Sequence, residues 1–220
     1  MILIGSRALA LRAPSCLHRA PVDFDFVATQ QEYEEWMAAN RGKIAISKEY
    51  DLPEFNKHII EGSPNIEFEI IAPGSSNELL AELVKDEECF DTPFGKIPTL
   101  DLLFTIKQSH RYKRFGSAND HPFWKTAIDW HSMRAIGAKV RPEYNEFLKR
   151  REAESYAAQK HPKLNVSKEN FFTDVFKYDH DSIHVAMKHL DKPAYLYYGK
   201  DNEPVLSDKA KFFAVSEEVR

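Results

Sequence analysis

Two aspartates one residue apart, Asp23 and Asp25, are the residues whose type and spacing point most directly to chemistry. They alternate with Phe24 and Phe26, which is typical of a β-strand whose acidic side chains share one face. Two carboxylates this close repel each other unless positive charge lies between them. Oxygen ligands of this kind bind hard divalent cations such as Mg²⁺ together with substrate phosphates. The pair therefore predicts a metal site, and the alternative interpretation is an edge strand with a solvated acidic face.

A second acidic strand is predicted over residues 65–72, where Glu67 and Glu69 alternate with apolar residues. If this strand lies beside the first, three or four carboxylates gather on one face. Such an arrangement is costly without metal but natural with two divalent ions. Because Glu67 and Glu69 share a face, the sequence leaves open which of them is the third ligand.

A short apolar run, Ile2 to Ile4, predicts a buried strand that ends at Gly5-Ser6. A helix is expected from about residue 7 to 12. Glycine allows a tight turn and close approach of a ligand to the backbone, and a helix N-terminus attracts anions. Ser6 is expected to cap this helix or to hydrogen-bond a phosphate. An ordinary strand–turn–helix is the alternative.

A basic cluster follows on a helix predicted over residues 99–114. Lys107 or Arg111 is expected to reach phosphates held by the carboxylates, and a solvated basic face is the alternative. The next predicted helix begins at His121-Pro122 and carries Asp129.

Composition indicates a soluble, cytoplasmic protein with no membrane partner. Hydrophobic residues make up 43% of the 220 residues, enough for a sizeable core, and no apolar run approaches the roughly 20 residues of a membrane span. Two cysteines, Cys16 and Cys89, form neither a disulfide framework nor a zinc cage. The net charge of −4 argues against a general nucleic-acid coat protein.

The pattern of elements predicts an α+β fold in two domains. Residues 1–96 are expected to form a mixed β-sheet with helices, and residues 97–220 a helical domain. The further elements expected in the first domain are strands near 43–46 and 56–61 and helices at 30–40 and 77–86, the latter capped by Asn77. Residues 88–98 are expected to be irregular or to form a small hairpin around Phe94-Gly95. A later helix is expected at 142–158.

Three motifs in order resemble the nucleotidyltransferase superfamily, which has the polymerase-beta-like fold: Gly5-Ser6, Asp23-x-Asp25 and Glu67/Glu69. The helical part is similar to the minimal nucleotidyltransferases of abortive-infection toxin type, through Leu103-x-x-x-Lys107 and Lys125-x-x-x-Asp129. The resemblance covers about residues 1–135.

The resemblance implies a role for each matched position. Asp23 and Asp25 would bind both metal ions, Mg²⁺ or Mn²⁺, and Glu69 or Glu67 would complete the site and help to deprotonate an acceptor hydroxyl. The remaining implied roles concern the nucleotide: Gly5 and Ser6 hold its β- and γ-phosphates, Arg7 assists them, Lys107 contacts phosphate, and Asp129 orients it.

The implied activity is a divalent-metal-dependent transfer of a nucleoside monophosphate from a nucleoside triphosphate such as ATP to an acceptor hydroxyl on RNA or protein. Two alternatives remain open. One is a metal-dependent phosphohydrolase acting on nucleoside monophosphates, at the carboxylates or at His180-Asp181, which resembles the metal-binding dipeptide of HD phosphohydrolases. The other is a non-catalytic nucleotide- or RNA-binding protein on the same fold.

Overall fold

The computed structural model describes residues 1–16, 21, 23–86, 88–110, 126, 129–130, 132–159, 196–198 and 204–206. The chain divides into two compact units. The first contains Met1–Ala13 and Pro21–Leu103, and the second contains Pro14–Ala20 and Phe104–Arg220. The predicted boundary near residue 96 stays a prediction.

The first unit is built on one mixed seven-stranded sheet, which confirms the predicted combination of an N-terminal mixed sheet with helices. Its strands, in spatial order, are β3 (Ala45–Leu52), β4 (Lys57–Ser63), β5 (Asn65–Ile70), β2 (Asp23–Ala28), β1 (Ile2–Ile4), β7 (Gly95–Ile97) and β6 (Phe90–Thr92).

The centre of the sheet is formed by β1, β2 and β5. Strand β1 pairs antiparallel with β2, and β2 pairs parallel with β5. All three residues of β1 are buried, as expected for an apolar run between two neighbours. The other neighbour of β1 is β7, which pairs with it in parallel, so the predicted hairpin around Phe94-Gly95 is an extension of the main sheet.

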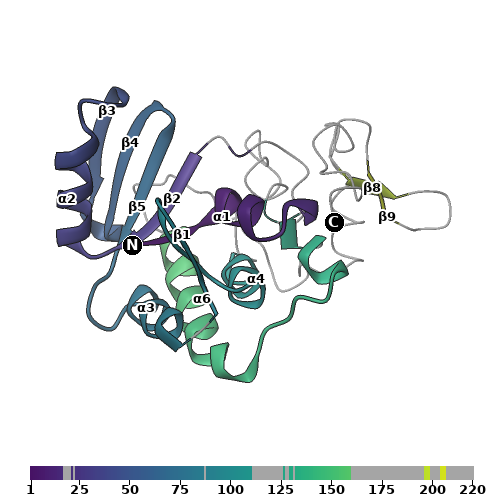
Figure 1. The fold of residues 1–220 in the computed structure, drawn as a ribbon. Coiled ribbons are helices and arrows are strands. Elements are labelled where there is room, and N and C mark those ends of the chain that lie inside the picture. Colours follow the sequence, from purple (N-terminus) through teal and green to yellow (C-terminus); the bar gives the residue numbers. More distant parts are fainter. Residues whose placement is uncertain are drawn as a thin grey trace. The chain divides into compact units, whose positions relative to one another are not determined.

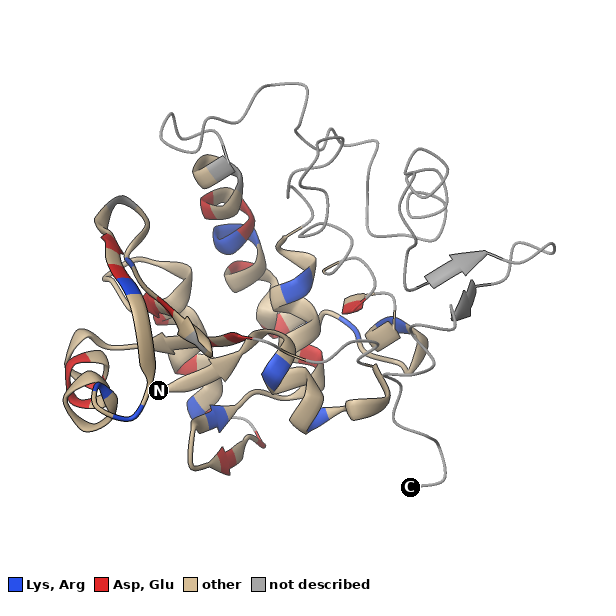
Figure 2. Ribbon diagram, turned by 90° about the horizontal axis from the view of Figure 1, so that it is seen from above, with Lys and Arg blue, Asp and Glu red and all other residues tan. Residues whose placement is uncertain are grey.

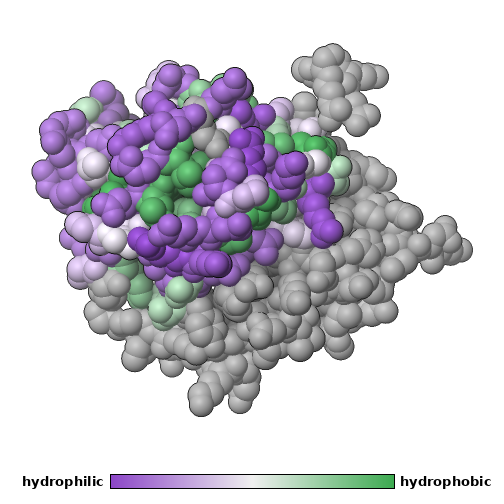
Figure 3. Space-filling view, turned by 90° about the horizontal axis from the view of Figure 1, so that it is seen from below, coloured by the Kyte–Doolittle hydropathy of each residue, from purple (hydrophilic) through white to green (hydrophobic). Residues whose placement is uncertain are grey.

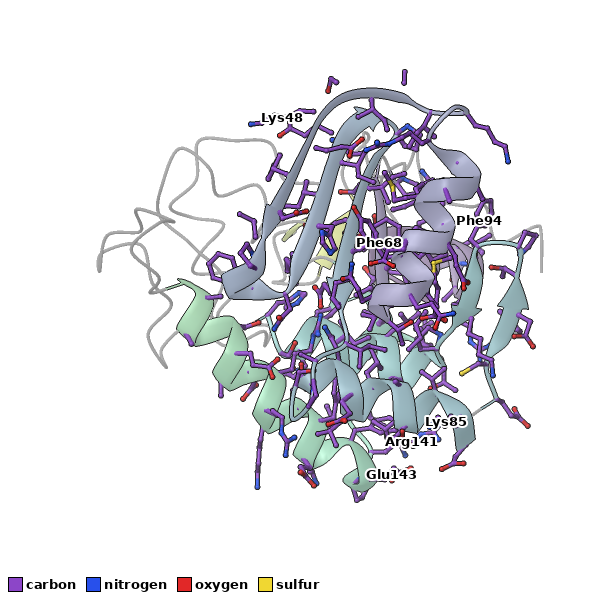
Figure 4. The ribbon with its side chains drawn as sticks, turned by 90° about the vertical axis from the view of Figure 1, so that its left-hand side faces the viewer. Lys48, Phe68, Lys85, Phe94, Arg141 and Glu143 are labelled. Carbon is purple, nitrogen blue, oxygen red and sulfur yellow. The ribbon has the colours of Figure 1, made fainter. Side chains whose placement is uncertain are left out.

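Helix α2 (Gln30–Asn40) covers one face of the sheet, beside β3, β4 and β5 in Figure 1. Its Trp36 ring lies 5.2 Å from that of Phe68 and 6.4 Å from that of Phe26, measured between centroids. Phe26 and Phe68 are buried, and Figure 4 shows Phe68 on the strands beneath α2. Burying one such side chain contributes about 1.5–3 kcal/mol, so the phenylalanine face of β2 is core.

Two helix starts differ from the sequence prediction. Helix α1 (Gly5–Arg12) begins directly after β1, with Ile4 at its N-cap and no side-chain cap, so Ser6 is not its cap. Helix α3 (Ser76–Asp86) begins one residue before Asn77, and Ser75 Oγ accepts a hydrogen bond from the Glu78 N–H at 3.3 Å. The predicted cap at Asn77 was therefore wrong, because Ser75 occupies the capping position.

In the second unit, helix is described for the C-terminal part of α4 (Leu100–Gln108), at residues 126, 129–130 and 132–135, and for α6 (Asn145–Gln159). A short 3₁₀ turn, η3 (Pro142–Tyr144), precedes α6. Tyr144 and Phe147 are buried at the start of α6. Strands β8 (Leu196–Tyr198) and β9 (Pro204–Leu206) form a two-stranded sheet. The predicted helical domain otherwise falls largely on residues outside those that the structure describes.

The surface that Figure 3 shows from below is mostly hydrophilic where it is described, with apolar side chains between the polar ones. In the described part of the chain, no helix is both long and apolar enough to cross a membrane.

Candidate functional site

The four predicted carboxylates lie on one face of the sheet, which we call the acidic face: Asp23, Asp25, Glu67 and Glu69. Asp25 pairs directly with Glu67, whereas Glu69 pairs with Val27. The two acidic strands are neighbours, which is the condition under which the sequence leads us to expect that these carboxylates gather. The register makes Glu67 the cross-strand neighbour of Asp25, which the sequence alone left open. Figure 2 shows how acidic and basic residues are distributed over the described part of the chain.

The side chain of Asp25 occupies space that is open because residue 5 is a glycine. A β-carbon at position 5 would lie 2.0 Å from Asp25 Oδ2, and Gly5 has a φ of +70°. The register explains this approach, because Ile4, the residue before Gly5, pairs with Asp25. The carboxylate of Asp25 therefore lies against the first residue of α1, where backbone N–H groups have no partner within the helix. A helix N-terminus and an acidic pair meet at this point.

Ser6 and Arg7 both turn toward β2. Ser6 is buried, and its Oγ lies 3.5 Å from Asp23 Oδ1, a long hydrogen bond to the carboxylate. Arg7 donates from Nε to the Asp23 carbonyl and from an Nη to the Pro21 carbonyl, both at 3.2 Å. Its guanidinium lies 3.9 Å from the centre of the Phe24 ring. These contacts fix the start of β2, and the phosphate contacts predicted for Ser6 and Arg7 stay predictions.

Lys57 is a residue of the acidic face that sequence reasoning missed. It opens β4, pairs with Glu69, and its Nζ contacts Glu67 Oε1 and lies 3.3 Å from Glu69 Oε1. A signal for it exists in the sequence. The turn at residues 62–64 fixes the register of the β4–β5 hairpin, and counting back from that turn places Lys57 opposite Glu69.

The acidic face has the donor chemistry that a hard divalent cation requires. Its carboxylates are oxygen ligands, and the space beside Gly5 accommodates one of them without a clash. Among the described residues, however, no three His, Cys, Asp or Glu side chains converge tightly enough to hold a metal ion as they stand. Glu67 contacts Lys57 instead. The residue types therefore fit Mg²⁺ or Mn²⁺, and Glu67 would have to exchange Lys57 for the ion.

The second unit contains a buried ion pair at two of the predicted residues. Lys107 Nζ lies 2.8 Å from Asp129 Oδ2, and the two side chains are 9% and 0% exposed. Beside it, Trp130 stacks on Phe104 and donates from Nε1 to Gln108 Oε1 at 2.6 Å. The structure thus brings Lys107 and Asp129 together, and their contact with a nucleotide stays a prediction.

Three further predicted site residues lie outside the described residues, and so does one residue of the motif that carries the resemblance: Arg111, His180, Asp181 and Lys125. The interpretations given to them from the sequence stay as they were.

Family models match two separate parts of the chain, and the match to the later part begins close to the boundary between the two compact units. A model described as "Domain of unknown function (DUF7275)" matches residues 102–220, more than half of the chain. The chain belongs to this family. A second model, "Domain of unknown function (DUF7277)", matches residues 1–84. The acidic face lies wholly in the DUF7277 segment, and the Lys107–Asp129 pair lies in the DUF7275 segment. No curated protein and no solved structure matches the chain.

Proposed function

We propose that the acidic face is the catalytic centre of a divalent-metal-dependent nucleotidyltransferase. One observation carries the proposal: the Asp25 carboxylate lies against Gly5 at the first turn of α1. Metal-binding carboxylates and a phosphate-binding helix N-terminus are the two features that a nucleoside triphosphate with its metal requires. The alternative of an edge strand is wrong, because β2 lies between β5 and β1 in the sheet.

Each residue has a part in this proposal. Asp23, Asp25 and Glu67 would hold Mg²⁺ or Mn²⁺, and the ion would offset the charge of the phosphates and polarise them. The N–H groups of the first turn of α1 bind phosphate oxygens. Ser6 keeps the Asp23 carboxylate in place through its hydrogen bond.

The reaction is an in-line substitution at the α-phosphorus. The acceptor hydroxyl oxygen forms a bond to the α-phosphorus while the bond from that phosphorus to the bridging oxygen breaks, and the electron pair leaves with pyrophosphate. The hydroxyl proton passes to a carboxylate of the acidic face, for which the register favours Glu67. The acceptor is proposed to be a hydroxyl group of RNA or protein.

Product analysis with Asp25→Asn tests the proposal. The full chain is incubated with each nucleoside tri- and monophosphate, with Mg²⁺ or Mn²⁺ and with cell extract as the source of acceptor, and products are separated with mass detection. We expect pyrophosphate and an acceptor whose mass has increased by one nucleotide. Asp25→Asn should lower the rate by about a hundredfold or more, because it removes a charge that faces the metal.

Asp91→Asn is the matched control, since Asp91 is an exposed aspartate on β6 of the same sheet. It should retain full activity. Retained activity in Asp25→Asn would contradict the proposal. Free phosphate and nucleoside from monophosphates would contradict it in favour of hydrolysis, and bound nucleotide without turnover would contradict it in favour of a binding protein.

A further inference from the structure

Lys57 is held in position by the backbone on both of its sides. Asn56, the residue before it, has a left-handed conformation with a φ of 49°, and its carbonyl accepts a hydrogen bond from Ile70 at 2.7 Å. Lys57 itself pairs with Glu69 in the β4–β5 hairpin. The Lys57 ammonium therefore reaches the acidic face from a fixed backbone.

The contacts of Lys57 involve the carboxylate that the proposed reaction needs. Lys57 Nζ contacts Glu67, the neighbour of Asp25, as well as Glu69. The side chains of Lys57 and Glu67 are 28% and 33% exposed, so this pair is reachable from solvent. A carboxylate oxygen that accepts a hydrogen bond from an ammonium group is less available to a metal ion, because both cations compete for the same charge.

We propose that Lys57 is the exchangeable cation of the acidic face. Without substrate it neutralises Glu67 and Glu69. When a divalent cation takes Glu67, the ammonium group is released on its flexible stem and contacts a phosphate of the bound nucleotide. This inference rests on the proposed function, since it assigns a role at the same site.

An ordinary structural ion pair between β4 and β5 makes a different prediction. If Lys57 only holds the strands together, its removal weakens the binding of both metal and phosphate to this face, or changes neither. An exchangeable cation predicts shifts in opposite directions: tighter binding of the metal alone and weaker binding of phosphate. The sign of the two shifts therefore separates the two roles.

The experiment uses the full chain and two probes. The first is Mn²⁺ alone, titrated by calorimetry without nucleotide. The second is inorganic tripolyphosphate at saturating Mg²⁺, which tests the phosphate contact without a base preference. Lys57→Met, which keeps an unbranched side chain and removes the charge, should bind Mn²⁺ about tenfold tighter and tripolyphosphate about tenfold more weakly, which corresponds to about 1.4 kcal/mol in each case.

Lys48→Met is the matched control. Lys48 lies on β3, two strands away from Phe68 on β5, and its Nζ is 4.6 Å from the centre of the Tyr50 ring (Figure 4). Both affinities should equal those of the wild type. Should Lys57→Met fail to fold because Glu67 and Glu69 lie side by side without their cation, Lys57→Met/Glu69→Gln removes the excess charge and leaves Glu67 for the metal.

Any combination other than opposite shifts overturns the role of Lys57. Asp25→Asn, measured in parallel, shows which conclusion has failed. If the wild type binds Mn²⁺ and Asp25→Asn does not, the metal site stands and an unchanged Lys57→Met refutes the exchange alone. If the wild type binds neither probe, the exchange and the proposed function both fail. Opposite shifts without nucleotide transfer support the exchange and contradict the transferase.

Discussion

The carboxylate of Asp25 fills the space that a side chain at position 5 would need. This relation decides the geometry of the acidic face, because it brings a strand residue and a helix N-terminus together. The sequence indicated the two aspartates through their alternation, and it indicated close approach at Gly5. It did not identify Asp25 as the approaching group, since that depends on the register between β1 and β2, which no single-strand pattern contains.

Gly5→Ala should lower both stability and metal binding. The added methyl group collides with Asp25 Oδ2, and the residue keeps a φ of +70° that favours glycine. We expect a loss of about 1–3 kcal/mol in the free energy of unfolding, measured by urea denaturation, and weaker Mn²⁺ binding by calorimetry.

Gly74→Ala is the control for the backbone strain. Gly74 has a φ of +75°, yet a β-carbon there meets nothing within 4 Å. Gly74→Ala should therefore cost some stability but leave Mn²⁺ binding unchanged. Equal effects of both substitutions on Mn²⁺ binding would show that the contact between Gly5 and Asp25 does not matter for the site.

At the scale of single elements, α2 shows where sequence patterns succeed. Its observed bounds, Gln30–Asn40, are those predicted. The start is marked by a capping box, in which the Glu32 N–H donates to Thr29 Oγ1 at 3.1 Å and the Thr29 N–H donates to Glu32 Oε2 at 2.8 Å. Both partners are local in sequence. The pairing of β7 with β1 joins residues far apart, which is why the hairpin was predicted and its place in the sheet was not.

Thr29→Ala should destabilise the first unit by about 1 kcal/mol, because it removes the cap of the helix that covers the core. The measurement is chemical denaturation followed by tryptophan fluorescence, since Trp36 lies on α2. Thr29→Ser retains the hydroxyl and should cost only a few tenths of a kcal/mol. An alanine variant as stable as the wild type would show that α2 is held by packing alone.

The carboxyl group of Glu32, the other partner of this capping box, makes the stability of the first unit depend on pH. Burial raises the pKa of Glu32, but hydrogen bonds from the N-terminal ammonium and from Thr29 outweigh it and leave the pKa below its ordinary value of 4.5. A carboxyl with a lowered pKa stabilises the fold above its unfolded value and loses that contribution as the pH falls. The cost of Thr29→Ala should therefore shrink below about pH 4.5.

For the whole molecule, the alternation of apolar and acidic residues was enough to predict a mixed sheet with helices at the N-terminal end. It was not enough to predict the strand order, because residues 45–63 form a hairpin that lies beside β5 and not beside the strand that precedes it in sequence. Lys57 is a different case, because its partner Glu69 lies in the same local hairpin and the turn at residues 62–64 sets their register. The helical second domain and its histidines stay predictions.

Stability against alkali is a property of the whole fold that two tyrosines should govern. Burial raises the pKa of Tyr33 above 10, and the nearby carboxylates of Asp51 and Glu49 raise it further. Burial also raises the pKa of Tyr50, with a smaller effect from its hydrogen bond to Glu61. At a pH between the unfolded and folded pKa values of these tyrosines, the native state binds more protons than the unfolded state. Their contribution to stability is therefore fully present below about pH 10 and is lost as the pH rises beyond it.

The measurement is the urea midpoint as a function of pH from 8 to 11. Tyr33→Phe/Tyr50→Phe should flatten the alkaline decline, since neither ring can then ionise. A decline equally steep in the double variant would assign the effect to other groups.

The position of β1 between β2 and β7 has a consequence for how the chain is made. All of β1 is buried, yet its second partner is reached only at Lys96, which pairs with Ile2. During synthesis β1 leaves the ribosome long before β7 has been made, so one edge of β1 stays unpaired for that time. An unpaired strand edge can pair with strands of other chains. The short hairpin of β6 and β7 closes that edge, and its outer strand is only three residues long and carries Asp91. A nascent chain that stops before this hairpin would therefore leave one edge of the apolar strand β1 unpaired, and synthesis of β7 up to Ile97 is what allows that edge to pair.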